Sequence, residues 1–224
     1  MNLTSLPINS ILQSINIVLV LNVTAIVVPL LVFLIVFWNN ATKDGFNEIK
    51  IFDLIFSGVI SAVLFAKVFY LISRGGGVYE FKFDVIGYVY GFYLVTVFLC
   101  KKWNWSYFRI LDLGAISAVA SVSMRFFVEV FIQLQKSFHV EKILIEKALL
   151  FVSLMVVYIL LTKYRNSRIK SGLIFSIFSI VLSLAYALSG KNPIYLIFSV
   201  GLITISITNA YLRLKNINLV VRKG

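Results

Sequence analysis

Residues 110–134 read ILDLGAISAVASVSMRFFVEVFIQL, and this segment is the most informative part of the chain. It is long and apolar enough to cross a membrane, because about 20 apolar residues span the hydrocarbon core. It also contains Asp112, Arg125 and Glu129, and charged side chains within a membrane usually face the protein interior or a water-filled cavity. Small residues fill its middle part, and small residues let helices pack closely in lipid. The sequence therefore predicts a membrane helix at the centre of a helix bundle.

The composition is typical of a membrane protein. Of the 224 residues 60% are hydrophobic, and the mean hydropathy is +0.97, whereas soluble domains are about half apolar. The net charge of +12 arises from basic residues in short loops, which predicts contacts with lipid headgroups and not nucleic-acid binding. A single cysteine and a single histidine exclude an internal disulfide and a site rich in these ligands. We therefore expect no metal and no other cofactor.

Apolar segments of sufficient length recur along the whole chain, without a soluble domain between them. They predict an all-α fold, a polytopic membrane helix bundle with seven transmembrane helices in a single integral membrane domain. The predicted spans are residues 15–38, 51–73, 84–100, 110–134, 145–163, 172–189 and 193–212.

The basic residues predict the orientation of these spans. Most of the 21 lysines and arginines lie in loops on one side, and such loops usually face the cytoplasm. Trp38, Trp103 and Trp105 fall at the same side, where interfacial aromatic residues are expected. With an odd number of spans, the N-terminus is then outside and the C-terminus is cytoplasmic.

Two cations within the spans are the first candidates for a binding site. A helical rise of about 1.5 Å per residue places Lys67 and Arg125 at similar depths in the outer half of the membrane. The guanidinium fork matches phosphate oxygens and the ammonium group adds a point charge, so an anionic phospholipid is the expected ligand. Asp84 and Tyr88 lie near the same side. The alternative is that Arg125 and Glu129 neutralise each other and that Lys67 extends to the membrane surface.

Asp112 has a different expected role, because it stands near the start of its predicted span. A carboxylate is favourable at the N-terminus of a helix, where it caps free N–H groups or complements the helix dipole. We therefore predict that Asp112 stabilises the start of its own helix.

Three motifs resemble a known family of membrane enzymes. The segment 52–72, FDLIFSGVISAVLFAKVFYLI, begins with Asp-Leu and has Lys67 and Tyr70 where the family has arginine and tyrosine. The segment 103–113, WNWSYFRILDL, combines an aromatic, basic loop with Leu-Asp-Leu, and Glu146 stands near the start of the fifth span. In this layout the chain resembles the prolipoprotein diacylglyceryl transferases. Of the family signature in the fourth span, the arginine is present as Arg125.

The resemblance implies an activity, partners and site residues. Members of the family transfer diacylglyceryl from phosphatidylglycerol to a lipobox cysteine, in lipoprotein biosynthesis at the bacterial inner membrane. The implied partners are an anionic phospholipid and the signal peptide of a lipoprotein precursor. The candidate catalytic residues are Arg125, Glu129 and Asp84, and the candidate lipid-phosphate ligands are Lys67, Arg125, Tyr70 and Tyr88. Two alternatives stay open, a non-catalytic relative that binds lipid or lipoprotein, and a small transporter.

Overall fold

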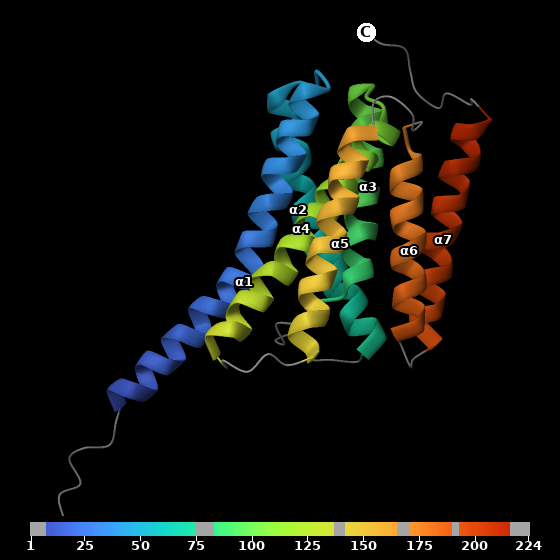
Figure 1. Cartoon of the computed structure of the whole chain (residues 1–224). Coiled ribbons are helices and arrows are strands. Elements are labelled where there is room, and N and C mark those ends of the chain that lie inside the picture. Colours follow the sequence, from blue (N-terminus) through green and yellow to red (C-terminus); the bar gives the residue numbers. More distant parts are fainter. Residues whose placement is uncertain (1–7, 75–82, 137–141, 165–170, 190–192, 216–224) are drawn as a thin grey trace, which may run out of the picture. The chain divides into compact units, whose positions relative to one another are not determined.

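The computed structural model describes residues 8–74, 83–136, 142–164, 171–189 and 193–215, with side chains in the first helix from residue 23 onward. These ranges contain helices and no strands, as Figure 1 shows. The helices are α1 (Ile8–Lys43), α2 (Glu48–Arg74), α3 (Val85–Trp103), α4 (Tyr107–Lys136), α5 (Lys142–Tyr164), α6 (Leu173–Ser189) and α7 (Pro193–Leu214).

The helices have the properties of membrane spans. Six of them are long and apolar enough to cross a membrane, and α6, at 17 residues, is the shorter apolar helix. The sequence prediction of an all-helical membrane protein is confirmed at this level, and each predicted span corresponds to one of the helices. Among the six, α4 has the largest buried share, 39% of its most apolar window. The helix with small residues in its middle is thus also the most enclosed one.

The described residues belong to two compact units, which we describe one at a time. Unit 1 takes its residues from 1–36 and 117–160, so it contains most of α1, the later part of α4 and most of α5. Unit 2 takes its residues from 37–116 and 161–224, and contains α2, α3, α6, α7 and the first part of α4.

Small hydroxyl residues of α4 mediate the helix contacts in unit 1. The Ser121 hydroxyl donates a hydrogen bond to the carbonyl of Pro29 in α1, at 2.8 Å. The Ser123 hydroxyl donates to the carbonyl of Phe151 in α5, at 3.2 Å. The rings of Phe127 and Phe151 lie 5.2 Å apart. Serine side chains are short enough to reach the backbone of a neighbouring helix in lipid, which explains the run of small residues in this segment.

Two glycines, Gly87 and Gly91, form a close contact between the backbones of α3 and α2 in unit 2. A Cβ atom on Gly91 would lie 2.5 Å from the carbonyl oxygen of Ser61, and one on Gly87 would lie 2.5 Å from the Cα atom of Ala66. The hydroxyl of Ser61 also donates a hydrogen bond to the carbonyl of Gly91, at 3.1 Å. A pair of glycines four residues apart is a known motif for close packing of membrane helices. Here it lets the backbones of α2 and α3 touch.

Candidate functional site

Arg125 and Glu129 form an ion pair within unit 1, and Lys147 joins them. The Nε atom of Arg125 lies 3.0 Å from Oε1 of Glu129, four residues later on α4. The Nζ atom of Lys147 on α5 lies 2.9 Å from Oε2 of the same carboxylate. We call these three residues the Arg125 cluster. It combines two positive charges with one negative charge, and 61% of the Arg125 side chain is exposed.

The alternative interpretation from the sequence was that Arg125 and Glu129 neutralise each other. The two side chains do form an ion pair, as that interpretation expects. Lys147, the second cation of the cluster, was not among the site residues predicted from the sequence. A signal for it exists in the sequence, because only a short connection, 137–141, separates α4 from α5. Helices joined by a short loop are antiparallel neighbours, so residues just before and just after the loop can meet.

Lys67 lies among aromatic rings in unit 2. Its ammonium nitrogen is 5.2 Å from the centre of the Tyr70 ring and 5.8 Å from that of the Phe83 ring. Phe83 in turn lies 6.2 Å from the ring of Tyr88. A cation over an aromatic face at this distance is attracted by the ring electrons. The structure thus brings together three of the residues predicted from the sequence, Lys67, Tyr70 and Tyr88, with Phe83 between them.

Asp84 connects three helices of unit 2. It caps the N-terminus of α3, where its Oδ1 atom accepts a hydrogen bond from the N–H of Ile86 at 3.0 Å. Its own N–H donates to the carbonyl of Ala66 in α2 at 3.0 Å. Its Oδ2 atom accepts a short hydrogen bond from the hydroxyl of Tyr186 in α6. The side chain is buried, and both carboxylate oxygens have partners that hold the fold.

The predicted site residues are distributed over the two units. Arg125 and Glu129 belong to unit 1, whereas Lys67, Tyr70, Asp84 and Tyr88 belong to unit 2. Arg125 contacts Glu129 and Lys67 contacts Tyr70, whereas the contacts of Asp84 and Tyr88 described above are with residues outside the predicted set. That a single lipid phosphate is held by both Lys67 and Arg125 stays a prediction of the sequence.

The role of Asp112 in the structure differs from the predicted one. It lies in the second turn of α4, is only 1% exposed, and accepts hydrogen bonds from the N–H groups of Gly172 at 2.6 Å and Phe175 at 2.9 Å. These N–H groups belong to the start of α6, so the prediction that Asp112 caps its own helix is wrong. The physical reason is that the first N–H groups of any helix need acceptors, and a buried carboxylate on a neighbouring helix supplies them.

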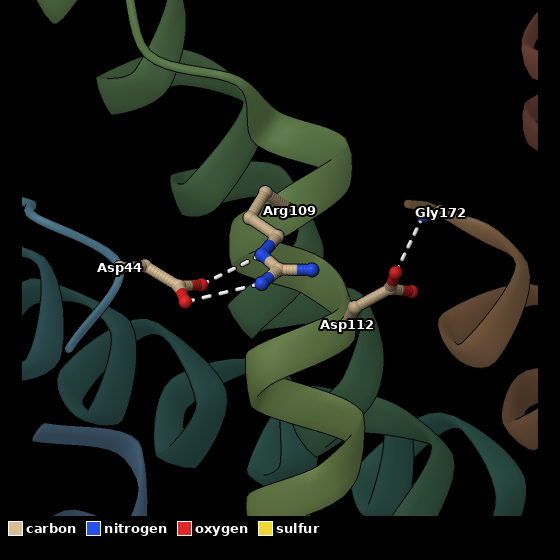
Figure 2. A network of polar contacts seen from close by, with 4 residues as sticks. All are labelled: Asp44, Arg109, Asp112 and Gly172. Carbon is tan, nitrogen blue, oxygen red and sulfur yellow. Dashed lines mark hydrogen bonds and ion pairs between the residues drawn. The ribbon is translucent and has the colours of Figure 1, made fainter. Parts of the chain in front are cut away.

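Arg109 lies one turn before Asp112 on α4 and also binds a segment outside its own helix (Figure 2). Its Nε and Nη2 atoms bind the two carboxylate oxygens of Asp44, at 2.6 and 3.0 Å. Asp44 belongs to the turn between α1 and α2. A bidentate pair of this type fixes geometry better than a single contact does. Arg109 and Asp112 therefore attach the start of α4 to the α1–α2 turn on one side and to α6 on the other.

The described residues contain no group of three or more histidine, cysteine, aspartate or glutamate side chains that could hold a metal ion. A comparison of the chain with models of protein families finds no match, and a comparison with curated proteins finds none either.

Proposed function

We propose that this protein binds an anionic phospholipid through the Arg125 cluster, and that it transfers diacylglyceryl from phosphatidylglycerol to a lipobox cysteine in the bacterial inner membrane. In this proposal all seven helices cross the membrane, with the N-terminus outside and the C-terminus in the cytoplasm. The observation that carries the proposal is the excess of positive charge in the cluster, two cations around one carboxylate on two helices that are apolar enough to span a membrane.

The depth of Lys147 suits a phospholipid phosphate. Lys147 lies in the second turn of α5, about 7.5 Å along the helix from its start at a rise of 1.5 Å per residue. A position this close to a helix end is near the headgroup region of a bilayer, where phosphates reside. Arg125 offers a planar fork and Lys147 a compact charge, and both are well suited to phosphate oxygens.

The chemistry of transfer assigns different tasks to the members of the cluster. The cysteine sulfur attacks the glycerol carbon of phosphatidylglycerol, so that a sulfur–carbon bond forms, the carbon–oxygen bond to phosphate breaks and glycerol phosphate leaves. Arg125 and Lys147 stabilise the charge of the leaving phosphate. When the phosphate takes over these two cations, Glu129 loses its partners and accepts the proton of the thiol, which must ionise to react.

Removal of either cation is expected to weaken lipid binding. We expect Arg125→Gln and Lys147→Gln each to lower the affinity for phosphatidylglycerol by about tenfold, or 1.4 kcal/mol, because one charge-assisted contact to phosphate is lost. Native mass spectrometry of the purified protein with phosphatidylglycerol, and with phosphatidylcholine for comparison, measures this change. Lys142→Gln is the matched control, since Lys142 is on the same helix, has the same charge and is 91% exposed.

A loss of binding that is equal in Lys142→Gln would show that general charge, and not the cluster, attracts the lipid. Unchanged binding in both Arg125→Gln and Lys147→Gln would show that the cluster is not the lipid site.

Glu129→Gln is expected to separate binding from transfer. The variant keeps both cations and lacks their competing carboxylate, so phosphatidylglycerol should bind at least as tightly as to the unmodified protein. Transfer to a synthetic lipobox peptide, measured as a mass increase of the peptide, should fall at least 100-fold, because general-base catalysis contributes about that much or more. If the folded, unmodified protein binds phosphatidylglycerol but yields no lipidated peptide, the protein is a non-catalytic lipid binder.

A further inference from the structure

A cleft of about 430 Å³ lies between the C-terminal halves of α3 and α7, entirely within unit 2. Its volume is in the range of about 300–1,000 Å³ that is usual for sites of small molecules. Val97 of α3 and Ile205 and Leu212 of α7 contribute apolar walls. Apolar walls of this kind suit the hydrocarbon chain of a lipid.

Asn209 is a buried polar residue in the lining of this cleft. It lines the cleft and is only 3% exposed, and its Nδ2 group has no hydrogen-bond partner among the described residues. Tyr93, which also lines the cleft, interacts with the Asn209 carboxamide, although no hydrogen bond of ordinary geometry reaches Nδ2. A buried donor without an acceptor costs about 1–3 kcal/mol. The structure therefore retains a donor that points to a ligand with an acceptor oxygen.

Lys101 and Trp105 lie at the rim of the same cleft. Lys101 is exposed, and it stands in the last turn of α3, where that helix reaches the end of its apolar segment. Tryptophan at a membrane surface commonly lies at the level of the headgroups. The cleft thus runs from a cationic, interfacial rim to an apolar interior with one unpaired amide.

We propose that this cleft binds one acyl chain and the glycerol ester of an anionic phospholipid. The chain lies against Val97, Ile205 and Leu212, the Asn209 amide donates a hydrogen bond to the ester carbonyl, and Lys101 pairs with the headgroup phosphate. Charge, depth and the unpaired donor together select a phospholipid over a neutral hydrocarbon. This site uses residues of unit 2 only, and it does not depend on the Arg125 cluster or on any transfer activity.

Photo-crosslinking of the full chain in nanodiscs tests the proposal. The probe is phosphatidylglycerol with a diazirine on one acyl chain, and the crosslinked residues are identified by peptide mass spectrometry. We expect labels on α3 and α7 at cleft residues, and we expect their yield to fall at least fivefold in Asn209→Leu and in Lys101→Gln. Lys102→Gln is the matched control, since Lys102 is the exposed neighbour that does not line the cleft.

Asn209→Leu also distinguishes a ligand role from a structural one. Leucine removes an unpaired buried donor, so the variant should unfold without added lipid at the same temperature as the unmodified protein or a higher one. Only the stabilisation by added phosphatidylglycerol should be lost. Labels spread evenly over exposed helix faces, or cleft labels unchanged in Asn209→Leu and Lys101→Gln, would overturn the proposal. Arg125→Gln should leave the cleft labels unchanged, which keeps this test separate from that of the Arg125 cluster.

Discussion

Gly91→Leu is expected to force α2 and α3 apart and to destabilise unit 2 by about 3 kcal/mol, the upper part of the usual range for overpacking. The reason is that the added side chain meets backbone atoms. Its Cβ atom alone would lie 2.5 Å from the carbonyl oxygen of Ser61 and 2.7 Å from the Cα atom of Ala62, and a backbone cannot turn aside as a side chain can. Thermal unfolding in detergent, followed by tryptophan fluorescence, measures the loss.

Ala185→Leu provides the comparison for this experiment, since Ala185 is an exposed helical residue in α6 of the same unit. It adds a larger side chain without a backbone neighbour in its way, and we expect little change in the unfolding temperature. Gly87→Leu should resemble Gly91→Leu, because a Cβ atom there would lie 2.5 Å from the Cα atom of Ala66. If Gly91→Leu unfolds at the same temperature as Ala185→Leu, the contact between α2 and α3 is not as close as described.

Asp112→Ala is the second substitution with a large expected effect, a loss of about 3 kcal/mol. The carboxylate accepts hydrogen bonds from the N–H groups of Gly172 and Phe175, and hydrogen bonds to a charged group contribute about 1.5–3 kcal/mol each. Alanine leaves both donors at the start of α6 without an acceptor. The unfolding temperature should fall, and protease cleavage just before α6 should become faster.

Asp112→Asn refines this test, because asparagine has the same shape but only one acceptor oxygen. It should restore part of the stability that alanine loses, with one N–H group of α6 satisfied and the other not. Asp53→Asn serves as the control, since Asp53 is an exposed acid on α2. If Asp112→Ala and Asp53→Asn have the same stability, the hydrogen bonds to α6 contribute nothing measurable.

The helices were predictable because membrane spans are a local property of the sequence. An apolar segment of about 20 residues is recognisable on its own, so α2 and α5 needed no knowledge of their neighbours. Lys67 and Tyr88 were also accessible as candidates, because helical rise and the position along a span give depth in the membrane, whereas Tyr70 was named from the family resemblance.

The pairings between helices were harder to predict, since they depend on which faces meet. Glu129 binds Lys147 and Asp112 binds the start of α6, and neither contact follows from hydropathy or spacing within one helix. The contact at Gly87 and Gly91 is different, because the glycine spacing in α3 is visible in the sequence and was a usable signal. The partner surface on α2, however, became evident only from the structure.

The hydrogen bonds of Asp112 also determine the order in which the chain can assemble as it is synthesised. Gly172 follows Asp112 by 60 residues, which at about 5–20 residues per second corresponds to roughly 3–12 seconds of translation. During this interval the newly inserted carboxylate has none of its final partners, and the residues of unit 1 from α4 and α5 are made in between. The residues of unit 1 are therefore synthesised before α6 and α7, and unit 2 is complete only once α7 has been made.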